Sequence, residues 1–186
     1  TYPVEIRYRP PAEDDDDVDM FRQIAEGVAE VSAVGPGDVL VFLPTERDIH
    51  EAAKVLRGRS FGGSKTEILP LYARLSIEEQ QRVFKTSAGR RIVLATNVAE
   101  TSVTIDGVTC VVDSGLARIA RHSPWSGIPS LEVEPVSRAS CTQRAGRAGR
   151  TRPGRVLRLF TKHDFDTRRA FEVPEVSRAD LAGAAL

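Results

Sequence analysis

Residues 39–43 (VLVFL) form a continuous apolar run, and Pro44-Thr45 follows it directly. An apolar run of this length without alternation is typical of a parallel strand that is buried on both faces of a sheet. Proline and threonine both favour the start of a helix, so we predict a helix that Thr45 caps and that continues to about Arg57. A buried strand followed by a helix is the repeating unit of an α/β fold.

The same alternation of strands and helices extends to both sides of this stretch. Strands are predicted at residues 4–8, 67–71, 91–96, 108–113 and 155–160, and helices at residues 18–34 and 76–84. Turn-forming residues separate the segments 116–121 and 131–136, which indicates a β-hairpin. We therefore predict one α/β domain with a mostly parallel sheet. Its ligand-binding loops are expected at the carboxyl ends of strands, after Leu43, Thr96 and Asp113.

The composition is that of a globular protein, with 41% hydrophobic and 28% charged residues in a chain of 186. The formal net charge is +0, yet acids cluster at residues 13–30 whereas residues 138–158 carry only basic charges. Such asymmetry is compatible with a positive groove on a neutral body. We interpret the acidic run at residues 13–17 as a solvated turn before a helix, not as a metal site.

Neither cysteines nor membrane-type segments suggest another class of protein. Cys110 and Cys141 show no C-x-x-C spacing, and Cys110 is expected to be a buried free thiol. No apolar run approaches the roughly 18 residues of a membrane helix and no signal peptide opens the chain, so we expect a cytoplasmic protein without a membrane partner. Because the chain starts at Thr1 and stops within the apolar segment 181–186, we expect residues 1–186 to be one domain excised from a longer protein.

Residues 138–158 contain seven arginines and no acid, and their centre reads QRAGRAGR at residues 143–150. On a helix, three of these side chains would share one face: Gln143, Arg147 and Arg150. Each of the two glycines would weaken that helix by about 1 kcal/mol relative to alanine, but would let another group approach closely. A solvated, salt-bridged face would carry interleaved acids, so this pattern favours phosphate binding by guanidinium groups.

The loop at residues 95–107 directly follows a predicted buried strand. It offers small polar side chains and two carboxylates: Thr96, Asn97, Glu100, Thr101, Ser102, Thr104 and Asp106. Hydroxyls, amides and backbone N–H groups at the end of a strand can hold a phosphate backbone without reading bases. The alternative interpretation is an ordinary polar turn.

Residues 95–107 and 143–150 together resemble motifs V and VI of the DEAH-box helicases of superfamily two, most closely the bacterial members. Residues 39–49 resemble motif IV, and other segments of the family match at residues 71–84, 111–115 and 152–160. DEAD-box relatives would differ at Asn97 and Gln143. The resemblance covers nearly the whole chain. It implies the second RecA-like domain of a helicase motor, a three-layer α/β fold with a β-hairpin insertion.

The resemblance further implies an ATP-dependent 3′-to-5′ RNA helicase whose ATP lies between two motor domains. The phosphate-binding loop, the DEAH acid and most ligands of Mg²⁺ would lie on the first domain, since this chain has no G-x-x-x-x-G-K-[ST] motif. The 186 residues alone are therefore expected to be inactive. The expected partners are RNA, the first motor domain and further C-terminal domains of the same chain.

The resemblance also assigns roles to single residues. Arg147 and Arg150 are expected to be arginine fingers that reach the γ-phosphate, and Gln143 to hold the attacking water. Arg144 points to another face of the helix and is expected to be structural. ATP-binding roles are implied for Phe84, Ser102, Thr104, Asp106 and Gly146. Phe84 would stack on adenine, and Asp106 would accept hydrogen bonds from the ribose.

Contacts to the RNA sugar-phosphate backbone are implied for Thr45, Arg74, Thr96 and Asn97. The hairpin resembles the strand-separating hairpin of the family, with Trp125 at its tip; alternatively, it is a plain surface ribbon or a contact to a neighbouring domain. Three other functions stay open at this point. They are a DNA-acting motor of the same superfamily, a non-catalytic nucleic-acid-binding module, and an unrelated α/β enzyme.

Overall fold

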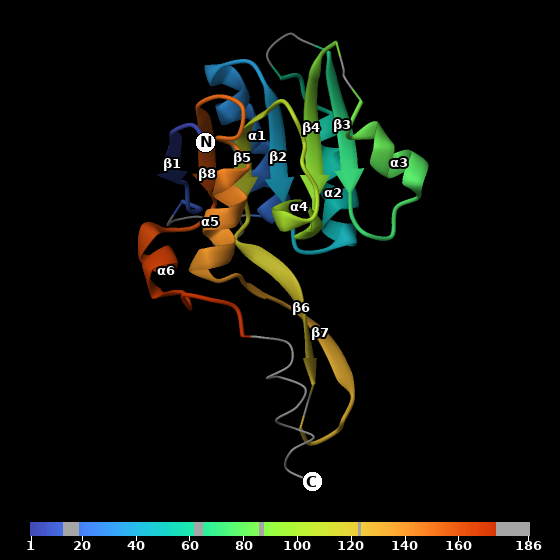
Figure 1. The fold of residues 1–186 in the computed structure, drawn as a ribbon, viewed down its shortest axis with the longest axis vertical. Coiled ribbons are helices and arrows are strands. Elements are labelled where there is room, and N and C mark those ends of the chain that lie inside the picture. Colours follow the sequence, from blue (N-terminus) through green and yellow to red (C-terminus); the bar gives the residue numbers. More distant parts are fainter. Residues whose placement is uncertain (13–18, 62–64, 86–87, 123, 174–186) are drawn as a thin grey trace.

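The computed structural model describes residues 1–12, 19–61, 65–85, 88–122 and 124–173, so the acidic run at residues 13–17 lies outside the described part (Figure 1). The strands are β1 (Val4–Tyr8), β2 (Asp38–Phe42), β3 (Thr66–Leu71), β4 (Arg90–Ala95), β5 (Val108–Asp113), β6 (Leu116–His122), β7 (Pro129–Pro135) and β8 (Gly154–Arg158). The helices are α1 (Met20–Val34), α2 (Glu46–Arg57), α3 (Ile77–Arg82), α4 (Val98–Thr101), α5 (Arg138–Gly146) and α6 (Lys162–Thr167).

Six strands form one sheet in the order β1-β8-β5-β2-β4-β3, and every neighbouring pair is parallel. The prediction of a mostly parallel sheet is thus confirmed. The apolar run at residues 39–43 forms the buried strand β2 between β5 and β4, as predicted. Because the strands are parallel, all their carboxyl ends lie at one edge of the sheet, the lower edge in Figure 1.

Helices cover both faces of this sheet, which gives the predicted three layers. Alternate residues of each strand face opposite sides. Val39 and Val41 of β2 pack with the apolar residues of α1 and α2 on one face. Leu40 and Phe42 pack with residues of α4 and α5 on the other face, which is in front in Figure 1. We call this second side the α5 face.

The helix boundaries follow local capping chemistry. Thr45 caps α2 as predicted, because its Oγ1 accepts a hydrogen bond of 3.1 Å from the Asp48 backbone N. The helix predicted at residues 76–84 ends at Arg82, so Phe84 lies in the turn that follows it. The short α6 follows β8.

The hairpin is confirmed: β6 and β7 pair antiparallel and extend away from the carboxyl edge of the sheet (Figure 1). The prediction of a helix through Arg150 is wrong in its second half, since α5 ends at Gly146. A tighter turn follows, in which the Arg147 N donates to the Arg144 carbonyl at 3.2 Å. The Gly149 carbonyl accepts a hydrogen bond of 2.8 Å from the Tyr2 N, which joins this turn to the chain before β1.

Candidate functional site

A pocket of about 360 Å³ lies at the amino edge of the sheet, opposite the hairpin. Three residues predicted to bind nucleotide line it: Phe84, Thr104 and Asp106. The other lining residues come from the starts of strands and the segments before them: Asp38, Lys85, Gly89, Arg91 and Gly107. The three predicted residues span 22 positions of the sequence (Phe84 to Asp106), and the whole lining spans 69 (Asp38 to Gly107).

Local packing turns these side chains outward. Ile105 is buried in the core of the α5 face, and its neighbours Thr104 and Asp106 are exposed. An extended segment alternates its side chains, so burying Ile105 presents both polar neighbours to the pocket. Phe84 is 48% exposed, which is unusual for a phenylalanine next to a core and leaves part of its ring available to a ligand.

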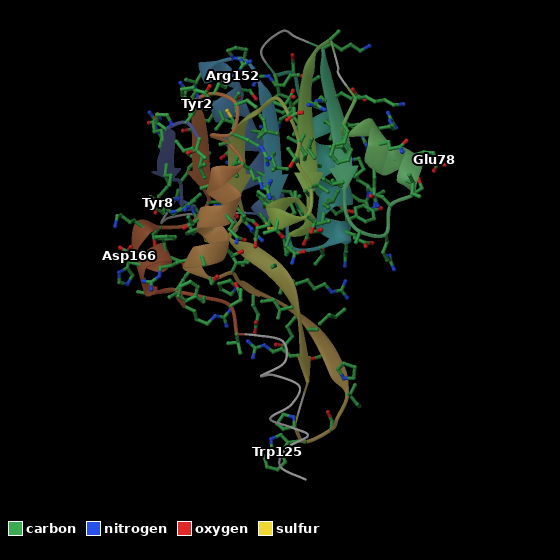
Figure 2. All side chains as sticks on the ribbon, viewed as in Figure 1. Tyr2, Tyr8, Glu78, Trp125, Arg152 and Asp166 are labelled. Atoms are coloured by element: carbon green, nitrogen blue, oxygen red, sulfur yellow. The ribbon has the colours of Figure 1, made fainter. Side chains whose placement is uncertain are left out.

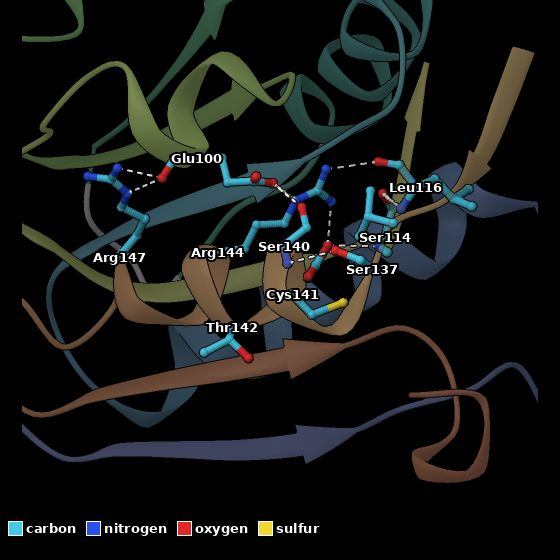
Figure 3. Close-up of polar contacts among 12 residues, drawn as sticks. Glu100, Ser114, Leu116, Ser137, Ser140, Cys141, Thr142, Arg144 and Arg147 are labelled. Atoms are coloured by element: carbon cyan, nitrogen blue, oxygen red, sulfur yellow. Dashed lines mark hydrogen bonds and ion pairs between the residues drawn. The ribbon is translucent and has the colours of Figure 1, made fainter. Parts of the chain in front are cut away.

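The residues of the arginine motif divide between exposed and buried positions. Gln143 and Arg150 are exposed, and Arg150 has neither an ion-pair nor a hydrogen-bond partner among the described residues. Arg147 is half-buried; its Nε donates at 2.8 Å to the Glu100 carbonyl oxygen, and its Nη2 donates to the same oxygen (Figure 3). Burial lowers the pKa of Arg147, and repulsion from Arg150 lowers it further, although Glu100 opposes both. Two cations thus lie near one another with little compensating negative charge.

Arg144 is fully buried and structural, as expected. Its Nε donates at 3.0 Å to the Glu100 carboxylate (Figure 3). Its Nη1 donates at 2.8 Å to Asp113, and its guanidinium lies 4.7 Å from the centre of the Phe42 ring. Burial alone would lower the pKa of Arg144, but Asp113 and Glu100 outweigh burial and raise it. Removing one partner of such a buried network typically costs about 3–5 kcal/mol.

The two glycines of the motif have different surroundings. A Cβ on Gly149 would lie 2.5 Å from Val4 Cγ2 and 2.7 Å from the Tyr2 carbonyl oxygen. Gly149 therefore allows the N-terminal strand to approach, which is a structural role and not the ligand contact that the sequence suggested. A Cβ on Gly146 would meet nothing within 4 Å among the described residues, so Gly146 keeps open space next to Arg147.

The residues expected to contact RNA lie at the opposite, carboxyl edge of the sheet. Thr45 precedes α2, and its hydroxyl is engaged by Asp48. Arg74 is 82% exposed and donates two hydrogen bonds, of 3.0 and 2.8 Å, to Glu46 at the start of α2. An exposed ion pair of this kind adds little stability, so Arg74 can exchange Glu46 for another anion.

Thr96 and Asn97 follow β4 at the same edge. The Thr96 N donates to the Leu71 carbonyl at 3.2 Å, which fixes the loop to the neighbouring strand β3. Asn97 is exposed and precedes α4, but its side chain makes no capping hydrogen bond. It lines a cavity of about 400 Å³ between α4 and the base of the hairpin, together with Arg118. Ser102 ends α4 and begins the segment that leads to the amino-edge pocket.

The hairpin carries an exposed apolar tip. Trp125 is 95% exposed and lies at the far end of the hairpin (Figure 2). On one face of the hairpin, Leu131 pairs with Ala120 and Val133 pairs with Arg118, and both apolar side chains of β7 are about half exposed. The alternation of an antiparallel ribbon places these residues on one side.

Residues 21–152 match the family model described as the helicase conserved C-terminal domain. The chain belongs to this family. It is 48% identical over 188 residues to the ATP-dependent RNA helicase HrpA of Escherichia coli, and 47% identical over 186 residues to the HrpA homolog of Haemophilus influenzae. Both alignments cover 100% of this chain and 14% of the relative, so the chain spans a small part of those proteins.

A solved structure gives the same assignment. The crystal structure of the E. coli DExH-box NTPase HrpB matches this helicase C-terminal domain with a TM-score of 0.88 at 38% identity, over 98% of this chain and 22% of that chain. The predicted membership of the DEAH-type helicases and the predicted RecA-like fold are both confirmed.

The location of the sites differs in part from the sequence-based expectation for this helicase domain. Ligands were expected at the carboxyl ends of strands, and the loops after Leu43, Thr96 and Asp113 do lie at that edge. However, the pocket with Phe84 and Asp106 lies at the amino edge. The reason is that the segment after α4 runs back along the α5 face before β5 begins.

Arg91 was not among the predicted site residues, yet it lines the amino-edge pocket although only 7% of it is exposed. The available signal was a charged residue inside the predicted strand at residues 91–96, on the same face as the buried Val93. A buried arginine needs several acceptors, and these acceptors come from segments that only the fold brings together.

Three further observations concern metals, thiols and membranes. Within the ranges that the structure describes, no group of three or more His, Cys, Asp or Glu residues is arranged to hold a metal ion. Cys110 and Cys141 are free and buried, and burial, with Asp113 as a second cause, raises the pKa of Cys141 to about 11. No helix in the described part of the chain has the length and apolar character that crossing a membrane requires.

Proposed function

We propose that this chain is the second motor domain of an ATP-dependent 3′-to-5′ RNA helicase and supplies one wall of an ATP site between two domains. The observation that carries the proposal is the pair Arg147 and Arg150. Arg150 has no partner among the described residues, Arg147 contacts only a main-chain oxygen through hydrogen bonds, and both follow a helix that packs on the α5 face. Guanidinium groups without a carboxylate partner in their own domain are available to bind an anion, such as a phosphate, from outside it.

The amino-edge pocket suits the base and ribose of a nucleotide. A half-exposed ring at Phe84 can stack on the face of any base, and the exposed carboxylate of Asp106 can accept hydrogen bonds from ribose hydroxyls. Thr104 adds a hydroxyl beside them. A second domain would close the open side of this pocket, as expected for a nucleotide that lies between domains.

In this proposal the residues of the arginine motif act on the phosphates. Arg147 and Arg150 stabilise the charge that develops on the γ-phosphate, and an arginine in this role is worth about 10³–10⁵ in turnover in well-studied NTPases. Gln143 orients the attacking water, and Gly146 leaves room for the phosphates. Mg²⁺ would be held mainly by the first motor domain and would neutralise phosphate charge there.

RNA would bind at the carboxyl edge. Thr45, Arg74, Thr96 and Asn97 supply hydroxyl, amide and guanidinium donors at that edge, and such groups hold a sugar-phosphate backbone without reading its sequence. Ser102 lies on the segment between this edge and the nucleotide pocket, where it couples the two. The direction of movement and the preference for RNA follow the DEAH-type family to which the chain belongs.

The test compares ATP hydrolysis by the full-length protein and by the 186-residue chain. We expect turnover by the full-length protein that single-stranded RNA stimulates more than DNA of the same sequence, and none by the chain alone. Turnover by the purified chain would contradict the two-domain site. Stronger stimulation by DNA would favour a DNA motor, and an inactive full-length protein would favour a non-catalytic binding module.

A further inference from the structure

Arg91 at the start of β4 connects the separate segments that form the amino-edge pocket. It is 7% exposed, and its partner Asp38, at the start of β2, is also mostly buried. The Arg91 Nη2 and Nε donate to Asp38 Oδ2 at 2.8 and 3.0 Å, and the Arg91 backbone N donates to Asp38 Oδ1 at 2.8 Å. Both residues lie on the α5 face, because their neighbours Leu40 and Val93 are buried there.

The remaining donors of the same guanidinium bind the two walls of the pocket. Nη1 donates to the Val83 carbonyl and, at 3.1 Å, to the Lys85 carbonyl, the residues on either side of Phe84. Nη2 donates at 2.6 Å to the Asp106 carbonyl. One planar group with fixed donor directions thus sets the position of the aromatic wall relative to the carboxylate wall.

Gly107 allows this arrangement. Its φ is +93°, and a Cβ at this position would lie 2.7 Å from Asp38 Oδ2. The Gly107 carbonyl also accepts a hydrogen bond of 3.0 Å from the Asp38 N. Asp38 is therefore held from two sides, and it can fix Arg91 in one orientation.

Stability alone is a weak explanation for this cluster, because burying an ion pair costs about as much desolvation free energy as the pair regains. The neighbouring arginine shows that no such cluster is needed at this end of β4. Arg90 points to the other side, where its Nη2 donates at 2.7 Å to the Gly35 carbonyl after α1. Of these two arginines, Arg91 is the one whose hydrogen bonds among the described residues reach the segments that carry Phe84 and Asp106.

We infer that Arg91, oriented by Asp38, is the positioning residue of the nucleotide pocket. It holds Phe84 and Asp106 at the separation that a base and its ribose require, and it thereby sets affinity for the nucleoside half of ATP and not the rate of phosphoryl transfer. The inference rests on the proposed function, since it assigns the pocket to the nucleoside.

The test uses Arg91→Lys in the full-length protein. Lysine keeps the positive charge opposite Asp38, but one ammonium group cannot also reach the carbonyls of both walls. We expect the KM for ATP to rise about tenfold, because a tenfold loss of affinity corresponds to the loss of about one well-oriented contact. The kcat at saturating ATP should stay within about twofold of wild type. Inhibition by tripolyphosphate, which has neither base nor ribose, should be unchanged.

Two comparisons separate positioning from a general loss of structure. Arg90→Lys is the matched control, and it should leave the KM for ATP unchanged. Phe84→Ala should raise the KM, and adding Arg91→Lys to it should raise the KM no further, because the wall that Arg91 positions is already gone. If Arg91→Lys does not fold, Asp38→Asn should give the same pattern with a smaller rise in KM.

Each contrary result overturns the inference in a recognisable way. If Phe84→Ala raises the KM but Arg91→Lys and Asp38→Asn do not, the positioning role is wrong and the proposed function stands. If Arg91→Lys lowers kcat and weakens tripolyphosphate binding to the same degree, its role is general stability. If Phe84→Ala itself leaves the KM unchanged, the pocket does not hold the base, and both proposals lose that site.

Discussion

Arg147 and Arg150 are chemically identical side chains in different surroundings, and this difference shapes what each substitution should do. Arg147 is held by two hydrogen bonds from its guanidinium to the Glu100 carbonyl, whereas Arg150 has no partner among the described residues. Arg147 therefore starts from a fixed position close to α4, and Arg150 is free to meet an anion that approaches from outside. Neither guanidinium has a carboxylate partner within the described residues that would have to be displaced.

We predict that Arg147→Ala or Arg150→Ala in the full-length protein lowers kcat for ATP by about 10³ or more and leaves RNA affinity nearly intact. Replacing either arginine with lysine should also lower kcat strongly, because an ammonium group cannot reproduce the two parallel N–H donors of a guanidinium. Steady-state hydrolysis and RNA binding by fluorescence anisotropy measure the two effects. Arg152→Ala, an exposed arginine of the same basic stretch, is the control and should turn over normally. Near-normal turnover by a substituted Arg147 or Arg150 would remove the finger assignment at that position.

Arg144 shows how far single residues could be predicted. Its position off the stripe of Gln143 correctly indicated a structural role. The acids that neutralise it, Glu100 and Asp113, are 44 and 31 residues away in the sequence, so the absence of acids within residues 138–158 did not mean that every arginine there was unpaired. Pairing across a fold leaves no local signal in the sequence.

Among the elements, the end of α5 was predicted least accurately from the sequence. Helical spacing predicted a helix through Arg150, but two glycines weaken the helix, and the N-terminal chain packs against Gly149 and donates a hydrogen bond to its carbonyl. Tertiary contacts of this kind override local propensity. By contrast, strand β2 and the Thr45 cap were predictable, because a strand buried on both faces and a helix cap each depend on residues that are adjacent or nearly adjacent in the sequence.

The two glycines of the motif should respond differently to alanine. Gly149→Ala would place a methyl group against Val4 and the Tyr2 carbonyl, and overpacking of this kind costs about 1–3 kcal/mol. Gly146→Ala meets nothing within 4 Å among the described residues, so it should keep or raise stability by up to about 1 kcal/mol while impairing ATP turnover in the full-length protein. Thermal unfolding of the 186-residue chain and hydrolysis assays check this pair. A Gly149→Ala chain that melts at the wild-type temperature would contradict it.

The loops at the carboxyl edge of the sheet give a prediction that depends on salt. Thr96→Ala combined with Asn97→Ala should weaken RNA binding about tenfold for every sequence tested, since two neutral backbone contacts are lost. The slope of log affinity against log salt should not change, because neutral side chains release no counterions.

Arg74→Ala should instead reduce that slope by about 0.7 for single-stranded RNA. Arg57→Ala, at the far end of α2, is the matched control and should leave the slope unchanged. Binding titrations at several salt concentrations distinguish these results. A loss of affinity confined to one RNA sequence would indicate base recognition at this edge.

Across the domain, the two candidate sites lie at opposite edges of one sheet and share the α5 face. The chain from Thr96 through α4 and Ser102 to Asp106 runs between them. Glu100 in α4 contacts Ser140 and Arg144 of α5 and Arg147 just after it. A shift of α4 on RNA binding would therefore move the Glu100 carbonyl and with it the Arg147 guanidinium that binds it. The residues at the two ends of this segment, Thr96 and Asp106, were predicted from the sequence. The contacts of Glu100 with α5 were not.

The hairpin extends from the carboxyl edge, next to the residues proposed to bind RNA and away from the nucleotide pocket (Figure 1). Its tip presents Trp125 at 95% exposure, and an exposed aromatic ring can stack on an opened base for about 1–3 kcal/mol. That is similar to the roughly 1.4 kcal/mol cost of opening one duplex step. Stacking of Trp125 on an opened base could therefore offset the cost of separating one base pair, as a wedge between the strands requires.

We predict that replacing residues 123–129 with a two-residue turn abolishes duplex unwinding by the full-length protein while RNA-stimulated ATP hydrolysis survives. The reason is that the hairpin supplies no residue of the proposed nucleotide site, so its tip can act only on the nucleic acid or on a neighbouring domain. Trp125→Ala should slow unwinding less than the deletion does, since β6 and β7 would still hold the strands apart. Strand-displacement and hydrolysis assays on the same preparations measure both. If unwinding by the shortened protein continues at the wild-type rate, the hairpin is a domain contact and strands separate elsewhere.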